Sequence, residues 1–274
     1  MKRILTILLA VLLPMVMQAQ SLPLRKGGDS LPFKGGEKFT YKLHYKLGPI
    51  NSDVAHATIS VDSVTYNGRK ALSARIFGQT AKFYDTFFKV REDFRSTFDY
   101  NLLPLHFYRD TREGSWYCKN DAQYVWNGAS SYARLTVENS AEELNTKDIP
   151  LQQGTCDITS MVYMMRNADM EKISEGQSFT GTMMLDGATF TMRMTYKGTA
   201  PLKDKTLGTV NVIRWSVRLN AGETFDTKED LIFMFTADAN RIPVRFEAPF
   251  KFGGVSGRLV AYEGIKYPVA YGLK

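Results

Sequence analysis

Hydrophobic and polar residues alternate along most of the chain in short segments, which is the pattern of half-buried β-strands. In the first segment, Phe39 and Tyr41 point to one face while Lys42 and His44 point to the other. Similar segments, including one expected at residues 83–91, follow at short spacing to about residue 262. Asn-Gly, Asp-Gly and Gly-Gly turns separate several of them. We therefore expect antiparallel strands to dominate the fold.

One stretch carries helical spacing instead, from about Asp157 to Asn167. Its apolar positions are Ile158, Met161, Val162 and Met165, which lie on one face of a helix. Asp157 or Thr155 can cap its N-terminus. The two patterns together predict an all-β protein, either a strongly curved antiparallel sheet or a large barrel, with one central α-helix.

A longer pattern occurs twice. The segment from Asp99 to Phe107 reads Asp-x-Asn-x-aliphatic-Pro-aliphatic-basic-Phe, and it recurs from Asp238 to Phe246, about 140 residues later. Each copy predicts a tight turn between strands, because Asp accepts hydrogen bonds from nearby amides, Asn tolerates positive φ and Pro suits the start of a strand. Two other pairs keep this spacing: Gly36-x-x-Phe39-Thr40 with Gly176-x-x-Phe179-Thr180, and Gly68 with Gly208.

These landmarks predict two related β halves on either side of the helix. The expected divisions are a signal peptide at 1–19, a flexible lead-in at 20–35, a first half at 36–154, the helix at 155–170, a second half at 171–262 and a tail at 263–274.

The N-terminus predicts export. Met1-Lys2-Arg3 precedes an apolar run from Ile4 to Met17, and Ala19 offers a cleavage site, as in a secretory signal peptide. The run is short for a membrane span, and no Cys follows it. We expect a periplasmic or secreted protein that neither spans the membrane nor carries a lipoprotein anchor.

The net charge of +7 is spread along the chain. The sequence has no basic run interleaved with aromatic residues, so nucleic-acid binding is not expected. A mildly basic protein suits an environment of anionic lipid or glycan.

The two cysteines, Cys118 and Cys156, are candidates for a disulfide, since export permits one. They could equally be two separate small core residues. The sequence contains no Cys-x-x-Cys, so thioredoxin-like redox chemistry is not expected.

His44 and His56 are equidistant from residue 50, so a symmetric hairpin would place them opposite each other on its polar face. Two imidazoles so placed are a weak candidate metal site, because such a site needs three or four ligands. The pattern favours a solvated polar face, and no cofactor is expected.

Acid–base residues show no catalytic arrangement. Glu92-Asp93 and Glu229-Asp230 are adjacent carboxylates, which point to opposite faces of a strand. No Gly-x-Ser-x-Gly motif or phosphate-binding loop is present.

Methionines gather on the helix and on the hairpin after it. Met adapts to irregular apolar shapes and is used at permissive binding surfaces, although it also fills ordinary cores. The candidate ligand-lining residues are Met161, Met165, Met183 and Met192.

Three motifs occur in a fixed order: Gly36-Glu37-x-Phe39-x-Tyr41, then Phe88-x-Val90-x-x-x-Phe94-x-Ser96-x-x-Asp99 leading to Pro104, then Asp157-Ile158-x-Ser160-x-x-Tyr163-x-x-Arg166. Together they resemble the DUF3108 family of exported bacterial proteins, with departures at Thr159 and Met164. The resemblance implies no catalytic residues. It also implies a loose similarity of fold to LolA-like and LolB-like curved β-sheet carriers, whose concave face holds acyl chains.

We therefore expect a non-catalytic cell-envelope protein that binds a lipid or another apolar or amphiphilic ligand in a concave β-sheet face. An alternative is a structural module that binds an envelope protein or glycan through its outer face or a sheet edge. A hydrolase acting on envelope glycan or lipid is a weaker alternative, which carboxylates converging in a cleft would favour.

Overall fold

The computed structural model describes residues 20–141, 144–219, 230–249 and 253–271, so the predicted signal peptide lies outside the described residues. The described chain forms one antiparallel sheet of 14 strands. The strands are β1 (Glu37–Leu47), β2 (Ile50–Tyr66), β3 (Arg69–Thr80), β4 (Val90–Phe98), β5 (Pro104–Glu113), β6 (Trp116–Val125), β7 (Tyr132–Asn139), β8 (Asn145–Pro150), β9 (Ser178–Leu185), β10 (Ala188–Asp204), β11 (Gly208–Leu219), β12 (Leu231–Thr236), β13 (Pro243–Pro249) and β14 (Gly254–Glu263).

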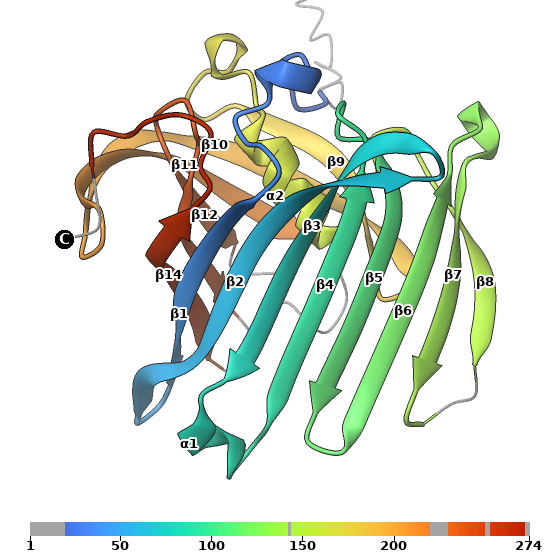
Figure 1. The fold of residues 1–274 in the computed structure, drawn as a ribbon, viewed down its shortest axis with the longest axis horizontal. Helices are drawn as coiled ribbons and strands as arrows, with labels where there is room; N and C mark the ends of the chain where they lie inside the picture. The colour runs from blue at the N-terminus through green and yellow to red at the C-terminus, as the bar shows by residue number, and fades with distance from the viewer. Residues whose placement is uncertain (1–19, 142–143, 220–229, 250–252, 272–274) are drawn as a thin grey trace, which may run out of the picture.

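The sheet curves into two arms that face each other (Figure 1). Its order runs from β8 to β1 and then from β14 to β9, with β1 paired to β14 where the arms meet. The end strands β8 and β9 are not hydrogen-bonded to each other, so the sheet stays open. The predicted fold class, an all-β curved sheet with one central helix, is confirmed.

The strand order repeats. Strands β1 to β6 form a six-strand meander, and β9 to β14 form a second one in the same order. The second strand of each, β2 or β10, is 17 residues long, and the third, β3 or β11, is 12. The two Asp-x-Asn turns both join the fourth strand of a meander to the fifth. The residue limits given above for the halves remain predictions.

The central helix α2 (Ile158–Arg166) lies between the two arms (Figure 1). Asp157 caps it, because its Oδ1 accepts hydrogen bonds from the amides of Thr159 and Ser160 at 2.9 and 2.8 Å. The hydroxyl of Ser96 on β4 donates to Asp157 Oδ2 at 2.7 Å. Most of the helix is buried, and Met161 and Tyr163 belong to the two main hydrophobic clusters. The amphipathic pattern therefore placed this helix correctly.

The free edge of β9 is covered by other parts of the chain. The amide of Thr180 donates to the carbonyl of Gln20 at 3.0 Å. Cys156 exchanges backbone hydrogen bonds with Thr182 and Met184 at 2.9 and 2.8 Å. Covering an edge in this way prevents pairing with another chain.

The segment at 20–35, expected to be a flexible lead-in, packs on the protein instead. Leu31 and Phe33 are buried in the core, since their apolar side chains have a hydrophobic surface to cover. The 3-10 turn η1 (Gly28–Ser30) rests on the first Asp-x-Asn turn, where the amide of Gly28 donates to the carbonyl of Tyr100 at 2.9 Å.

The strand expected at residues 83–91 is wrong in its first half. Residues Lys82–Asp85 form the short helix α1, and β4 begins only at Val90. In the described part of the chain, no helix has both the length and the apolar character needed to cross a membrane.

Candidate functional site

A hollow of about 420 Å³ lies beside α2 on the inner face of the sheet. Its walls come from the N-terminal segment, the loop before α2, the helix itself, β9 and β10. The lining residues are Ser21, Leu22, Leu24, Gln153, Gly154, Met164, Thr180, Gly181, Met192 and Met194. We call it the methionine cavity.

A second cavity of about 350 Å³ shares Leu24, Gln153, Gly154 and Met164 with the methionine cavity. Its other lining residues include Asp99 and the segment 101–104 of the first Asp-x-Asn turn. The two hollows therefore adjoin, with the four shared residues on both walls.

Strand pairing explains how the methionines reach this place. Met192 pairs with Gly181, and Met194 pairs with Phe179, so both methionines share the inner face. A Cβ atom at Gly181 would lie 3.1 Å from Met192 Cε, so glycine here leaves room for the long side chain.

The N-terminal segment closes the cavity from the other side. The amide of Arg25 donates to the carbonyl of Asn167 at 2.9 Å, and Asn167 Nδ2 donates to the carbonyl of Arg25 at 3.0 Å. These two bonds fix Leu24 beside the end of α2, where it also forms a backbone bridge with Ala168.

The predicted lining residues divide between two environments. Met161, Met165 and Met183 are buried in the hydrophobic core and line neither hollow, whereas Met192 does line the methionine cavity. Met164, Met194 and Leu24 line it as well and were missed. Whether any of them contacts a ligand remains a prediction.

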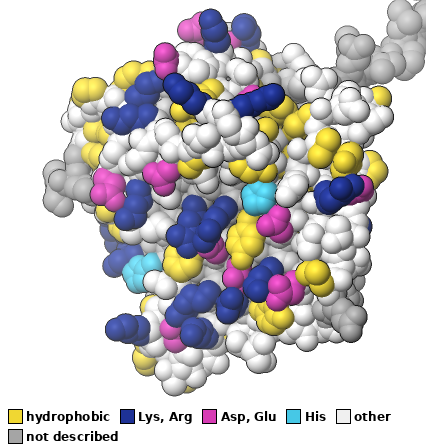
Figure 2. All heavy atoms as spheres, turned by 45° about the vertical axis from the view of Figure 1, so that its right-hand side comes forward, with side chains coloured by type: hydrophobic (Ala, Val, Ile, Leu, Met, Phe, Trp, Pro, Cys, Tyr) yellow, Lys and Arg dark blue, Asp and Glu magenta, His cyan; other side chains and the backbone are white. Residues whose placement is uncertain are grey.

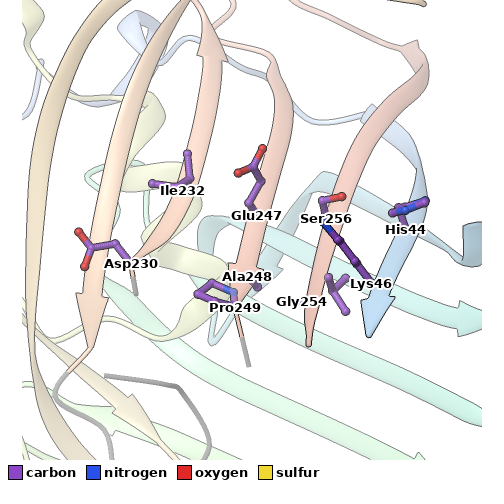
Figure 3. Close-up of a pocket in the computed structure, with 10 residues that line it drawn as sticks. His44, Lys46, Asp230, Ile232, Glu247, Ala248, Pro249, Gly254 and Ser256 are labelled. Carbon is purple, nitrogen blue, oxygen red and sulfur yellow. The ribbon is translucent and has the colours of Figure 1, made fainter. Parts of the chain in front are cut away.

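A different, polar hollow lies on the outer face of the sheet (Figure 3). It has a volume of about 340 Å³ and crosses β12, β13, β14 and β1, with His44, Lys46, Glu247 and Ser256 on its walls. A neighbouring polar hollow of about 450 Å³ shares His44 and Ser256. Charged side chains dominate the wall of the second hollow, whereas the first also has Ile232, Pro249 and Val255 on its wall.

The predicted opposition of His44 and His56 is wrong. The hairpin turns at Gly48 and Pro49, where Leu47 pairs with Ile50, so His44 pairs with Asp53. A β-bulge between Leu43 and His44 then leaves His56 paired with Lys42. His44 Nδ1 lies 3.1 Å from Asp53 Oδ1, and its Nε2 lies 2.7 Å from Asn51 Oδ1. Across the described ranges, no group of three or more His, Cys, Asp or Glu side chains could hold a metal ion.

The candidate disulfide is not formed, since Cys118 and Cys156 are both free. Cys118 lies on β6, whereas Cys156 is buried where the chain pairs with β9. Burial raises the pKa of the Cys156 thiol, as expected for an inert core cysteine.

A polar cluster lies on the inner face of β4 and β5. Thr111 Oγ1 donates to Glu92 Oε2 at 2.7 Å and accepts from Arg109 Nε at 2.7 Å. Arg109 also pairs with Asp186, from the turn between β9 and β10. Burial raises the pKa of Glu92, although the Thr111 hydrogen bond and the Arg109 charge oppose this.

The adjacent carboxylates of the sequence do not act together. Glu92 faces inward, whereas Asp93 binds Arg75 and Arg95 at 2.7 and 2.6 Å on the outer face. Glu229 lies outside the described residues, and Asp230 binds Arg218 at 2.6 Å.

Comparison with known proteins places the fold and the family. A crystal structure of a β-barrel-like protein of DUF1849 from Brucella abortus matches with a TM-score of 0.53 and 12% identity, covering 90% of this chain and 100% of that one. A putative lipoprotein from Parabacteroides distasonis gives a TM-score of 0.38 and 11% identity, covering 87% of this chain and 100% of that one. No curated protein matches the chain. Residues 40–260 match DUF3108, a family of unknown function. The chain therefore belongs to the DUF3108 family.

Proposed function

We propose that this protein is an exported, non-catalytic cell-envelope protein that binds an apolar or amphiphilic ligand in the methionine cavity. The observation that carries the proposal is the cavity itself, about 420 Å³ in volume and walled by Met164, Met192, Met194, Leu22 and Leu24. Small-molecule sites have volumes of this order and are mostly apolar, with a few polar groups.

The side chains of the wall suit a ligand of variable shape. Unbranched thioethers repack around irregular apolar surfaces such as acyl chains. Gln153, Thr180 and Ser21 supply polar groups at the same cavity, which an amphiphile could use for its polar end. The adjoining 350 Å³ hollow offers room for a longer chain if Leu24 or Met164 moves.

A binding role agrees better with the described acidic groups than hydrolysis does. Glu92 and Asp186 approach the same cluster, yet Thr111 binds the first and Arg109 pairs with the second. Each carboxylate is therefore already engaged. Export is supported by the basic and apolar character of residues 1–19.

The test uses native mass spectrometry of protein purified without detergent, followed by rebinding of a fluorescent fatty acid to delipidated protein. We expect co-purified amphiphile and saturable rebinding. Met164→Trp should fill the space between the two hollows and abolish rebinding. Met170→Trp is the matched control, because Met170 is partly buried against the same core but lines neither hollow.

Absence of both co-purified amphiphile and rebinding would contradict the proposal. Equal binding by the two tryptophan variants would show that the ligand lies elsewhere.

A further inference from the structure

The large hydrophobic side chains that remain exposed gather at one edge of the sheet. Among the described residues, seven large hydrophobic side chains are exposed: Leu47, Phe83, Phe87, Phe88, Trp116, Val125 and Leu144. All except Val125 lie at the connections β1–β2, β3–β4, β5–β6 and β7–β8. We call these six residues the hydrophobic rim.

The topology explains why they meet. In an antiparallel meander every second connection falls at the same edge, and these four connections share the lower edge in Figure 1. Strands lie about 4.8 Å apart, so successive tips are separated by about 10 Å and the four tips extend over roughly 30 Å. The rim is thus a row of projecting tips rather than a hollow.

The longest tip is the connection that contains α1. The exposed fractions of Phe83, Phe87 and Phe88 are 68%, 74% and 55%. The rings of Phe83 and Phe87 contact each other edge to face, with their centres 5.5 Å apart. The rings are therefore presented as one apolar group.

Polar contacts with the adjoining strands hold this tip in place. Arg91 Nη2 donates to Asp85 Oδ2 at 2.6 Å, and Thr80 donates to the same carboxylate. Tyr84 and Ser52 share a hydrogen bond of 2.7 Å between their hydroxyls, which ties the tip to the neighbouring β1–β2 hairpin. The phenylalanines are exposed although the backbone that carries them is anchored.

The charges beside the rim differ from those on the outer face. Figure 2 shows Lys and Arg side chains there interspersed with Asp and Glu, and many are paired, as in Arg75–Asp93–Arg95. At the rim, Lys46, Lys82 and Lys89 make no ion pair within the described residues. The described acids there are Asp85, which Arg91 neutralises, and Glu113, and the sequence has Glu142 and Glu143 directly before Leu144. The β1–β2 and β3–β4 tips of the rim are therefore apolar with a positive surround.

We propose that the hydrophobic rim docks this protein on a lipid bilayer that contains anionic lipids. Phe and Trp side chains insert at the boundary of headgroups and acyl chains, while the lysines lie near lipid phosphates. Separate projecting tips suit a deformable bilayer, because a protein partner would need a hollow shaped for each of them. This inference does not depend on the methionine cavity, since Met164 and the Asp99 turn lie at the opposite edge.

The test is flotation of the chain from Gln20 onward with vesicles of phosphatidylcholine, with or without phosphatidylglycerol. This form lacks the apolar Ile4–Met17 segment, which could bind vesicles itself. We expect binding that phosphatidylglycerol strengthens. Phe83→Ser with Phe87→Ser should lower partitioning about tenfold or more, because both rings lose an apolar environment. Lys82→Gln with Lys89→Gln should lower it about tenfold, and only on the anionic vesicles.

Val125→Ser is the matched control, because it removes an exposed apolar side chain from the other edge of the sheet. It should leave flotation unchanged, and the midpoint of thermal unfolding should be similar in all variants. Failure of the original protein to float with either vesicle would overturn the proposal, as would equal losses for Val125→Ser and the phenylalanine variant. Self-association that the serine substitutions abolish, without flotation, would assign the rim to a second copy of the chain.

Discussion

The two Asp-x-Asn turns have the same backbone design but different surroundings. In the first, Asp99 Oδ1 accepts hydrogen bonds from the amides of Asn101 and Leu103 at 2.8 and 2.9 Å. In the second, Asp238 Oδ1 accepts from the amides of Asn240 and Arg241, both at 3.0 Å. The residue after each Asn has positive φ, 66° at Leu102 and 52° at Arg241. The sequence pattern predicted the positive φ at the Asn residues themselves.

The two turns differ in the groups that contact them. Arg166, at the C-terminal end of α2, donates to the carbonyls of Asn240 and Arg241 at 2.8 and 3.0 Å. Asn240 also exchanges two hydrogen bonds with the backbone of Tyr267 in the C-terminal tail, both within 2.9 Å. The first turn is held by other groups: the amide of Gly28 donates to the carbonyl of Tyr100 at 2.9 Å, and Trp126 Nε1 donates to the carbonyl of Pro104 at 2.6 Å. Its segment 101–104 also lines the 350 Å³ hollow.

The difference teaches how one repeated element can serve two purposes. At the second turn, the helix end and the tail fill the space beside the turn. At the first, the N-terminal segment contacts the turn through Gly28, and residues 101–104 line the hollow that adjoins the methionine cavity. We infer that the second turn contributes more to stability and that the first is free to adjoin a binding site.

The largest expected effect comes from Arg166→Met. Both Arg166 and Glu37 side chains are 0% exposed, and Arg166 Nη2 lies 2.9 Å from Glu37 Oε2. Removing the guanidinium leaves a buried carboxylate and two turn carbonyls without a donor, so the free energy of unfolding should fall by about 3–5 kcal/mol. Urea unfolding measures this change. Adding Glu37→Leu should restore part of the loss, whereas a loss below about 1 kcal/mol would contradict the assigned role.

The next largest effect is expected for Asn240→Ala, whose loss of unfolding free energy is compared with that of Asn101→Ala. Asn240 is buried and bonded to Tyr267 at both ends of its amide, so its replacement should cost about 1–3 kcal/mol of unfolding free energy. Asn101 is exposed, so the same change should stay within about 0.5 kcal/mol. Equal effects in urea unfolding would mean that the two turns are not differently supported.

A third pair of variants, at the equivalent position of each turn, should change the free energy of unfolding in opposite directions. Replacing Leu102 or Arg241 by glycine relieves about 1 kcal/mol of left-handed strain. Leu102 is buried, and the loss of its side chain costs roughly 1.5–3 kcal/mol, so Leu102→Gly should be net destabilising. Arg241 is half-buried, its Nε has no partner, and burial lowers its pKa, so Arg241→Gly should stabilise the protein by about 1 kcal/mol. Thermal unfolding of both variants provides the comparison.

Local pattern was enough to predict much of this architecture. Alternation identified the strands, and apolar spacing with a capping Asp identified α2. The Asp-x-Asn pattern identified both turns. These features depend on neighbours in the chain, which any reader of the sequence can see. The segment at 83–91 shows the limit, because its aromatic residues fit a strand although Phe83, Phe87 and Phe88 project into solvent.

The candidate site was harder to predict from the sequence, because it depends on long-range contacts. Met164 and Met165 are neighbours on one helix, yet only the first faces the cavity, since Leu24 returns from the N-terminus to close that side. The metal hypothesis failed because the β1–β2 hairpin turns at Gly48 and Pro49 and not at residue 50, which places His44 opposite Asp53. A small change in the position of a turn changes every pair along the two strands, and spacing in the sequence alone does not fix that position.

The smallest expected effect concerns pH and the other end of the helix. Asp157 is fully buried without a cationic partner, and burial raises the pKa of its carboxyl, although hydrogen bonds from Ser160 and Ser96 oppose this. A carboxyl whose pKa is raised on folding stabilises the protein below its unfolded pKa, near 3.9, and that contribution is lost as the pH rises through the folded value. Asp157→Asn should remove this decline, since an amide can still accept the capping hydrogen bonds and does not ionise. Urea unfolding from pH 4 to pH 7 should give a flatter stability profile for Asp157→Asn than for the original protein. Parallel profiles for the two proteins would show that ionisation of Asp157 does not destabilise the fold. The two ends of α2, with unpaired Asp157 and paired Arg166, would then not differ in this respect.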